Sequence, residues 1–246
     1  MPISNAEQTA NLIHDPDCKT WALTRIAAAQ MQAGDVRGAR RTLGTALQTS
    51  AKIQDVSYRG AAQAAIVRGR IQSHDLLSAQ QSVLTIQDAH SRDLALLAVV
   101  EAQNLDRAQQ TAVGIRDPAL KACALTRIAI VQRQRSDKAG AQRTLLRATQ
   151  TAERSNDLNA GIPALLAIAA AQADDRAAAR KTILHAQQKA KEIRNADDRA
   201  SALQEIAETQ AALGDKAGAK QTIAGIDNAQ GRIFALLAAA EAPSEK

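Results

Sequence analysis

Apolar residues recur along this chain at spacings of three and four, which is the period of one face of an α-helix. The pattern is shown by Leu23, Ile26 and Ala27 in one segment and by Ala39, Leu43 and Ala46 in the next. No window sustains the alternation of apolar and polar residues that a half-buried strand requires. The sequence therefore predicts an all-α protein without a β-sheet.

The same pattern returns at two fixed offsets along the chain. Residues 22–27 reappear as residues 124–129, at an offset of 102. Residues 60–103 match residues 200–243 without a gap, at an offset of 140. Self-similarity on this scale is typical of a solenoid, in which each repeat packs against its neighbours.

The two offsets differ by 38 residues, which is one repeat length. The second half of the chain is therefore a copy of the first half with one extra unit at about 155–194. We interpret 1–246 as a single repeat domain, in which 5–106 was duplicated into 107–243. A repeat array explains the length of the chain better than one large globular core does.

Aspartates mark the predicted helix starts. Gly34-Asp35 and Gly214-Asp215 each combine a residue suited to the left-handed end of one helix with a cap for the next helix. Twelve aspartates fall at such positions: Asp15, Asp35, Asp55, Asp75, Asp88, Asp117, Asp137, Asp157, Asp175, Asp197, Asp215 and Asp227. The array has about fourteen antiparallel helices. It opens over 5–16 with the second helix of a hairpin and closes over 228–242 with the first helix of another.

The unit resembles the tetratricopeptide repeat. Around the Gly34-Asp35 turn, the matching positions are the large residues Leu23, Ile26 and Leu43 and the small residues Ala27, Ala39 and Ala46. The resemblance implies a right-handed α-α superhelix with a concave groove, faced here by Trp21, Thr24, Met31, Thr126, Arg133, Gln204 and Glu208. Our first hypothesis is a non-enzymatic scaffold that binds a peptide or protein partner along this face, since a preformed surface loses little entropy on binding.

Two other functions stay open. Basic residues fall on the predicted second helices, namely Arg40, Arg41, Arg143, Arg147, Arg180, Lys181 and Lys220. Such a stripe suits a phosphate backbone, but it also suits a solvated outer face. The formal charge of +6 is mild, and three aromatic residues are too few to stack a base on each repeat. The third hypothesis is sequestration of a small apolar molecule between alanine-lined helices.

No residue pattern predicts catalysis, a metal site or a cofactor. Cys18 and Cys123 are too few for a disulfide framework and lack metal-ligand spacing. The four histidines form no i, i+4 pair with another ligand type, and the Asp174-Asp175 and Asp197-Asp198 pairs fall where helices are capped. Four recurring glutamines are interpreted as half-buried hydrogen-bonding residues between helices, with ligand contact as the alternative: Gln30, Gln132, Gln172 and Gln210.

The chain does not begin with a charged and then apolar leader, and its longest apolar run, 164–171, is too short to cross a bilayer. We therefore expect no membrane insertion and a cytoplasmic location, or a periplasmic one if a leader has been removed. An array that begins and ends in mid-hairpin exposes its terminal faces. Self-association through one end is a further hypothesis.

Overall fold

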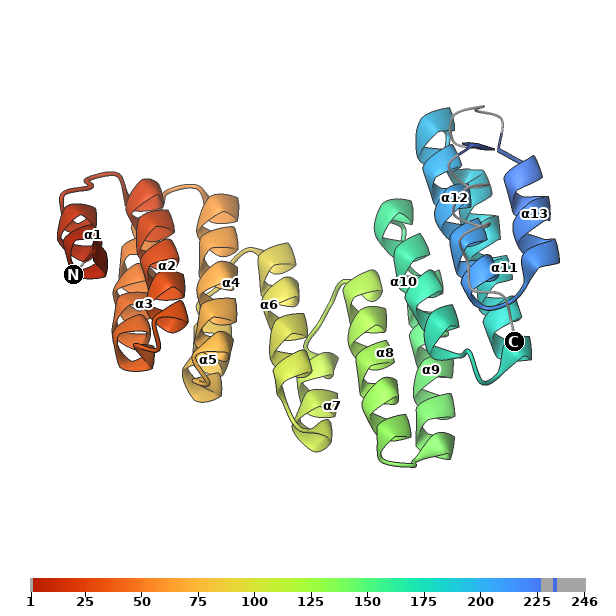
Figure 1. The fold of residues 1–246 in the computed structure, drawn as a ribbon, viewed down its shortest axis with the longest axis horizontal. Helices are drawn as coiled ribbons and strands as arrows, with labels where there is room; N and C mark the ends of the chain where they lie inside the picture. Colours follow the sequence, from red (N-terminus) through yellow and green to blue (C-terminus); the bar gives the residue numbers. More distant parts are fainter. Residues whose placement is uncertain (1, 227–231, 234–246) are drawn as a thin grey trace. The chain divides into compact units, whose positions relative to one another are not determined.

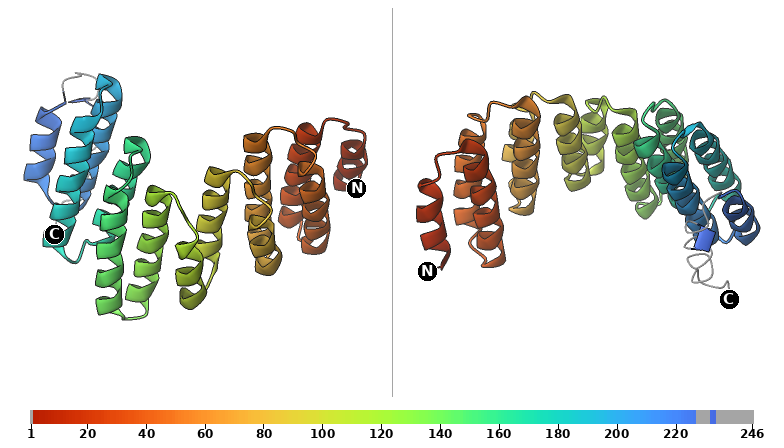
Figure 2. Two further views of the ribbon diagram at one scale, coloured as in Figure 1. Left: turned by 180° about the vertical axis from the view of Figure 1, so that it is seen from behind. Right: turned by 90° about the horizontal axis from the view of Figure 1, so that it is seen from above.

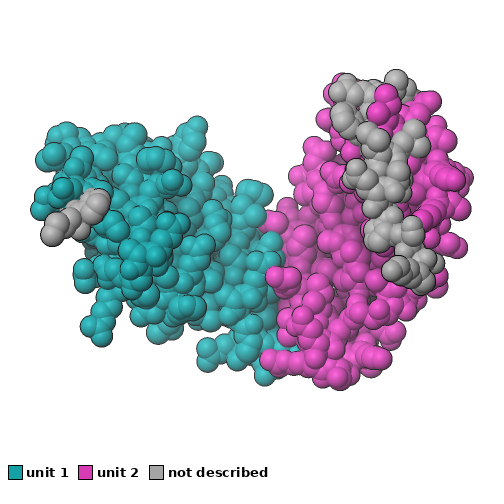
Figure 3. All heavy atoms as spheres, viewed as in Figure 1, with its two compact units in different colours: residues 1–116 teal, residues 117–246 magenta. Residues whose placement is uncertain are grey.

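The computed structural model describes residues 2–226 and 232–233, and all regular secondary structure in them is helical (Figure 1). These residues form thirteen α-helices and no strand. The all-α prediction is confirmed, and consecutive packed helices fit a solenoid-like fold. The fourteenth helix expected over 228–242 lies almost entirely outside the described residues. The contacts divide the chain into two compact units, 1–116 and 117–246 (Figure 3).

The first unit consists of a single helix followed by three helical hairpins. Its helices are α1 (Pro2–Asn11), α2 (Pro16–Gln32), α3 (Val36–Ser50), α4 (Val56–Gln72), α5 (Leu76–Val83), α6 (Ala89–Ala102) and α7 (Leu105–Val113). The first helices of the hairpins, α2, α4 and α6, pack against each other in chain order. Each second helix packs against its hairpin partner, and α1 packs against α2 as α3 packs against α4. This placement fits the expectation that the array opens with a second helix.

The second unit contains three more hairpins, shown from two further sides in Figure 2. Its helices are α8 (Pro118–Gln134), α9 (Lys138–Glu153), α10 (Leu158–Ala171), α11 (Arg176–Glu192), α12 (Ala196–Ala212) and α13 (Lys216–Ala224). The first helices α8, α10 and α12 pack in a row, and α9 and α11 each also contact the first helix that follows. The extra unit inferred at about 155–194 is the hairpin of α10 and α11.

Small residues allow the two helices of a hairpin to approach closely. One alanine near the start of each of six second helices is at most 4% exposed: Ala39, Ala79, Ala108, Ala141, Ala179 and Ala219. Larger side chains such as Leu43, Ile128 and Ile206 fill the space around them, and each is at most 2% exposed. Because a buried methyl group contributes little, the fold depends on many equivalent contacts repeated along the chain.

Ten of the twelve predicted aspartates cap helices, each accepting a hydrogen bond from a backbone N–H in the first turn. Asp197 was predicted wrongly: the cap of α12 is Asn195, whose Oδ1 accepts from the N–H of Asp197 and of Asp198. Asp227 lies outside the described residues. Local capping chemistry therefore sets most of the helix starts.

The caps have two geometries, and one of them brings the cap carboxylate close to the Cβ position of the residue three places later. The aspartates before second helices have ψ angles of 64–81°, against 103–125° before first helices. In the smaller-ψ form, a Cβ at Gly38 or Gly140 would come within 2.0 or 1.9 Å of the cap Oδ2. Where a Cβ is present, at Ser78 and Ala178, the cap bonds lengthen to 3.2 and 3.1 Å, from 2.8 Å at those glycines.

None of the described helices is both long enough and apolar enough to pass through a lipid bilayer.

Candidate functional site

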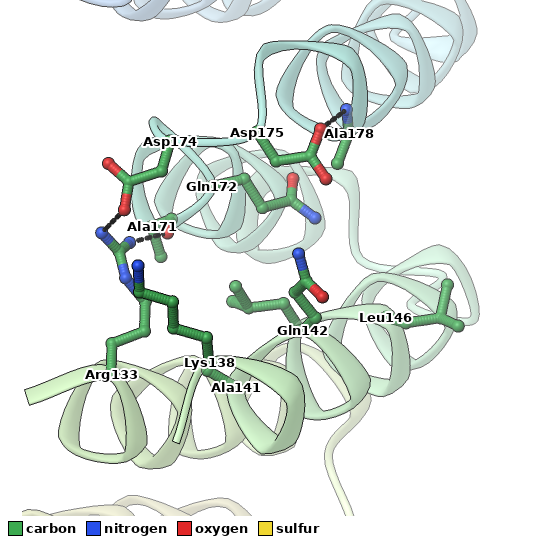
Figure 4. A pocket seen from close by; sticks show the side chains of 11 residues that line it. Arg133, Lys138, Ala141, Gln142, Leu146, Ala171, Gln172, Asp174, Asp175 and Ala178 are labelled. Carbon is green, nitrogen blue, oxygen red and sulfur yellow. Dashed lines mark hydrogen bonds and ion pairs between the residues drawn. The ribbon is translucent and has the colours of Figure 1, made fainter. Parts of the chain in front are cut away.

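A hollow of about 540 Å³ lies in the second unit, between α8 and α9 on one side and the turn from α10 to α11 on the other (Figure 4). Its apolar lining comes from Ala141, Leu145, Leu146, Ala171 and Ala178. Its polar lining comes from Arg133, Lys138, Gln142, Gln172, Asp174 and Asp175. The volume falls within the range of ordinary ligand sites, which combine apolar walls with a few polar groups.

The hollow lies beside a position that two other hairpins fill with arginine, one with lysine and two with glutamine. This position comes five residues after the residue that caps the second helix, and Arg40, Gln142 and Arg180 occupy it on α3, α9 and α11. Arg40 donates from Nε and Nη2 to the carbonyl of Ser73, at 3.0 and 2.6 Å. Ser73 belongs to the turn of the next hairpin, so this arginine ties neighbouring hairpins together.

Arg180 reaches the next turn in the same way, and its Nε lies 3.6 Å from Oδ2 of the cap Asp215. The hollow at that junction measures about 100 Å³ and is lined by Arg180 itself. Gln142 is shorter and uncharged, and its amide makes no hydrogen bond with any described residue. Two successive junctions of one unit therefore differ in open volume by about fivefold, and they also differ in the residue at this position and in the backbone of the turn that follows.

The turn above the hollow also differs from four of the other five turns inside hairpins. The residue before the cap aspartate is left-handed in four of them, at Gly34, His74, Ser136 and Gly214. There the cap N–H bonds to a carbonyl five residues earlier. In the α10–α11 turn, the N–H of Asp175 bonds instead to the carbonyl of Gln172, three residues earlier, at 2.7 Å. This tighter closure places Gln172 and Asp174 at the edge of the hollow.

Gln172 is 9% exposed, and a hydrogen bond from α11 fixes the orientation of its side-chain amide. Its Oε1 accepts a hydrogen bond of 2.8 Å from the hydroxyl of Thr182 on α11. Its Nε2 has no hydrogen-bond partner among the described residues, and the amides of Gln142 and Gln172 point toward one another across the hollow (Figure 4). Nε2 is not among the buried atoms that lack a partner, so water can reach it, and a ligand in the hollow would have to supply an acceptor in place of that water.

Arg133 bridges the other end of the hollow. Its guanidinium donates to the carbonyl of Ala171 and to a carboxylate oxygen of Asp174, so it joins α8 to the end of α10. A second hollow of about 580 Å³ shares Arg133, Lys138, Ala171 and Asp174 with the first. Its remaining lining comes from Ile130, Gln134, Ala167 and Ala170. Two hollows thus flank one ion pair.

Charge is unevenly balanced at this end of the site. Arg133 is paired with Asp174, whereas Lys138 makes no hydrogen bond or ion pair with any described residue. Asp175 caps α11, where the helix N-terminus compensates a negative charge. Figure 4 shows the side chain of Lys138 beside that of Arg133. One positive charge therefore remains without a counterpart.

Of the seven groove residues expected from the resemblance, three lie on α2. Thr24 and Met31 line a separate hollow of about 180 Å³ in the first unit, which includes Leu43 and Gly69. Trp21 is 68% exposed, and the guanidinium carbon of Arg25 lies 5.9 Å from the centre of its ring. The structure brings Thr24 and Met31 together, whereas Trp21 does not line that hollow.

The other four expected groove residues lie in the second unit. Among them, only Arg133 lines the hollow of about 540 Å³. Thr126 is 4% exposed, with its hydroxyl bonded to the carbonyl of Ala122, so the expectation that it faces a partner does not fit its burial. On α12, Gln204 donates to Glu208 at 2.9 Å. Partial desolvation and the charge of Glu208 raise the pKa of the neighbouring Glu205.

The expected basic stripe is interrupted. Arg40 and Arg180 are used between hairpins, as described above. The remaining five basic residues are exposed, and their side chains make no hydrogen bond or ion pair with a described residue: Arg41, Arg143, Arg147, Lys181 and Lys220. Arg143 and Arg147 share one face of α9, because they are four residues apart.

Polar contacts elsewhere have structural roles. Gln30 donates to Glu7 at 2.7 Å, and Gln210 accepts from Thr222 at 2.6 Å, which supports the interpretation of these two glutamines as hydrogen-bonding residues between helices. The buried Oε1 of Gln132 has no hydrogen-bond partner among the described residues, so the interpretation does not extend to Gln132. His185 on α11 pairs with Glu153 on α9. Within the described ranges, no three His, Cys, Asp or Glu side chains gather as a metal site. The predicted capping role of Asp174 was wrong, because its carboxylate pairs with Arg133.

Sequence reasoning missed Lys138, Gln142, Gln172 and Asp174 as members of one site. A signal for Gln142 was present, since aligning the cap aspartates places it opposite Arg40 and Arg180. A signal for the turn was also present, because Ala173-Asp174 stands where Gly34 and Gly214 end other helices. No pattern in the sequence indicated that the side chain of Arg133 would pair with Asp174.

No protein-family model matches the chain, and no curated protein matches its sequence. Among solved structures, the chain is similar to the crystal structure of Ton1535 from Thermococcus onnurineus NA1, with 12% sequence identity and a TM-score of 0.36. The match covers 97% of this chain and 84% of that chain. At that TM-score the two chains share too little geometry for the likeness to bear on function.

Proposed function

We propose that this chain is a non-enzymatic helical-repeat scaffold, and that the hollow beside Gln142 receives a peptide segment of a partner protein. The observation that carries the proposal is the fivefold difference in open volume between the junctions at Gln142 and Arg180. A repeat protein gains stability from equivalent contacts between neighbours. An open junction at which Nε2 of Gln172 has no partner among the described residues fits a binding role better than a structural one.

The resemblance to the tetratricopeptide repeat supports the same proposal of a peptide-binding scaffold. It rests on the small and large positions of the repeat, and it supplies the general expectation of peptide binding by a preformed surface. The site proposed here lies between a second helix and the next turn, rather than along the first helices. Arg133 is the residue that both interpretations share.

Selection from a random peptide display library tests the proposal. We expect peptides that bind the wild-type protein and bind Gln142→Arg at least about tenfold more weakly, because the arginine can span the hollow as Arg180 does. Arg180→Gln is the matched control, since it changes the equivalent position one junction further and should leave the affinity unchanged.

The proposal fails if no peptide is enriched, or if the enriched peptides bind wild type and Gln142→Arg equally well. Binding of a mixed-sequence oligonucleotide that falls steeply between about 50 and 200 mM salt would favour the nucleic-acid hypothesis instead. In that case Arg143→Ala with Arg147→Ala should reduce binding, while Gln142→Arg should not. Thermal unfolding of each variant establishes that the fold is retained.

A further inference from the structure

The chemistry of the hollow narrows the kind of segment it accepts. Three polar side chains that line it, Lys138, Gln142 and Gln172, offer N–H groups without a partner among the described residues. Two of its carboxylates are already engaged, since Asp174 pairs with Arg133 and Asp175 caps α11. The free groups are therefore mostly donors, and one of them carries a positive charge.

The Arg133–Asp174 pair shows that a carboxylate fits at this end of the site. The side chain of Asp174 is 78% exposed, whereas that of Arg133 is 34% exposed. An ion pair with so exposed a partner adds little to stability, because water screens the attraction and competes for the carboxylate. Another carboxylate can therefore take its place on Arg133 at little cost, with Lys138 beside it to compensate the added charge.

Apolar surface lies on both sides of this charged point. The first hollow offers Leu145, Leu146 and Ala178, and the second offers Ile130 and Ala167. Leu146 is 57% exposed, so a ligand in the first hollow would cover apolar surface that now faces water. An occupant that reaches both hollows must be elongated, with its acidic group near the middle. A peptide segment meets this requirement, and a compact small molecule does not.

We infer that the site selects an extended peptide in which an Asp or Glu residue lies between two apolar residues, and that its carboxylate displaces Asp174 from Arg133. One apolar side chain then enters each hollow, while the amides of Gln142 and Gln172 bond the peptide main chain. A side-chain amide carries both a donor and an acceptor, which matches the two groups of a peptide unit. Asp174 acts as a competitor built into the chain. This inference rests on the proposed function of the same hollow.

The library selection described above also tests the inference when its sequences are analysed. We expect enrichment of peptides with an acidic residue flanked on both sides by apolar residues. For a synthetic peptide of that kind, exchange of its acidic residue for the matching amide should weaken binding about tenfold. Lys138→Gln should weaken it to a similar extent. Lys216→Gln is the matched control, because Lys216 follows the cap of α13 as Lys138 follows the cap of α9.

Asp174→Asn gives the most specific result. Removal of the competing charge should tighten binding of the acidic peptide by about threefold to tenfold, and should leave the amide version of the same peptide unaffected. A merely structural role of Asp174 would weaken both peptides or neither. Circular dichroism of Asp174→Asn and Lys138→Gln verifies that each variant is folded.

The outcomes separate the two proposals. Enriched peptides that are sensitive to Gln142→Arg but show no preference for acidic residues would overturn this inference and leave the proposed function standing. Equal affinity of wild type and Asp174→Asn for the acidic peptide would overturn the competitor role. Absence of any enriched peptide would overturn the proposed function, and this inference with it.

Discussion

Gln142 and Arg180 occupy the same position of two successive second helices, but only Arg180 reaches the turn of the hairpin that follows, where it lies 3.6 Å from Asp215. Gln142 leaves the corresponding space open, and the hollow there has a volume of about 540 Å³. The backbone of the α10–α11 turn also differs there, since the N–H of Asp175 bonds to the carbonyl of Gln172, so the shorter side chain and the tighter turn together shape the space. In the first unit, the guanidinium of Arg40 makes the corresponding contact, because it donates to the carbonyl of Ser73 in the turn of the next hairpin.

Replacement of Arg40 by alanine should lower the free energy of unfolding by about 1 kcal/mol, because the carbonyl of the buried Ser73 loses its donor. Arg41→Ala is the control: Arg41 is exposed and its side chain makes no hydrogen bond or ion pair with a described residue, so its loss should cost less than about 0.5 kcal/mol. Denaturant unfolding followed by circular dichroism measures both. Equal stability of the two variants would contradict the clamping role.

A glycine at Ser136 should stabilise the second unit. Ser136 has a φ of 67°, in the left-handed region that costs an L-residue about 1–2 kcal/mol, and the greater backbone entropy of glycine in the unfolded state offsets part of the gain. We expect an increase of about 0.5–1 kcal/mol in the free energy of unfolding. The reverse change, Gly34→Ser, should destabilise by a similar amount, because no atom lies within 4 Å of the added Cβ and only the backbone strain remains. An unchanged midpoint for both variants would argue against strain at this turn position.

The hydroxyl of Thr222 should contribute more to the free energy of unfolding than the hydroxyl of Thr209. It donates to Gln210 at 2.6 Å and accepts from Gln187 at 2.8 Å, and Thr222 is 5% exposed. Thr222→Val leaves both amides without this partner and should cost about 1–3 kcal/mol. Thr209→Val removes a hydroxyl bonded to the carbonyl of Glu205 in its own helix and should cost less than about 0.5 kcal/mol. Similar losses in the two variants would show that the contact between helices contributes little.

Acid should weaken the cap of α6. Hydrogen bonds from the side chain and the backbone N–H of Ser91 hold the pKa of Asp88 below its ordinary value. A lowered folded-state pKa contributes stability that is present above the unfolded value of about 3.9 and is lost as the pH falls through the folded value. The free energy of unfolding should therefore decrease from about pH 5 to pH 3, and Asp88→Asn should flatten part of that slope while preserving the cap.

Carboxyl NMR titration measures the pKa of Asp88 directly. Ser91→Ala serves as the control, because it removes the side-chain hydrogen bond and should move the pKa of Asp88 back toward the ordinary range. A pKa that is ordinary in the wild-type protein, or that does not respond to Ser91→Ala, would contradict this account.

Local chemistry explains why the helices could be predicted. An aspartate cap bonds to an N–H only a few residues away, so its effect is visible in the sequence around Asp35 or Asp137. Where two caps compete within a few residues, the sequence was ambiguous, and Asn195 rather than Asp197 starts α12. His74 precedes the cap Asp75 as Gly34 precedes the cap Asp35, and both have positive φ angles.

The candidate site could not be predicted to the same extent. Its members come from four helices and one turn, and Arg133 meets Asp174 across 41 positions of the chain. Whether a long side chain spans the gap between two hairpins depends on the distance between them and on what fills the space. Neither quantity is encoded by helical periodicity.

The sequence by itself determined that this protein is all helical, that it is built from repeated hairpins, and where most of the helices begin, because these features depend on contacts within a few residues. Only the tertiary structure decided that the junction at Gln142 is open, that Gln172 holds a free donor toward it, and that Asp174 pairs with Arg133 instead of capping a helix. These features depend on the distances between packed hairpins and on the reach of single side chains across them.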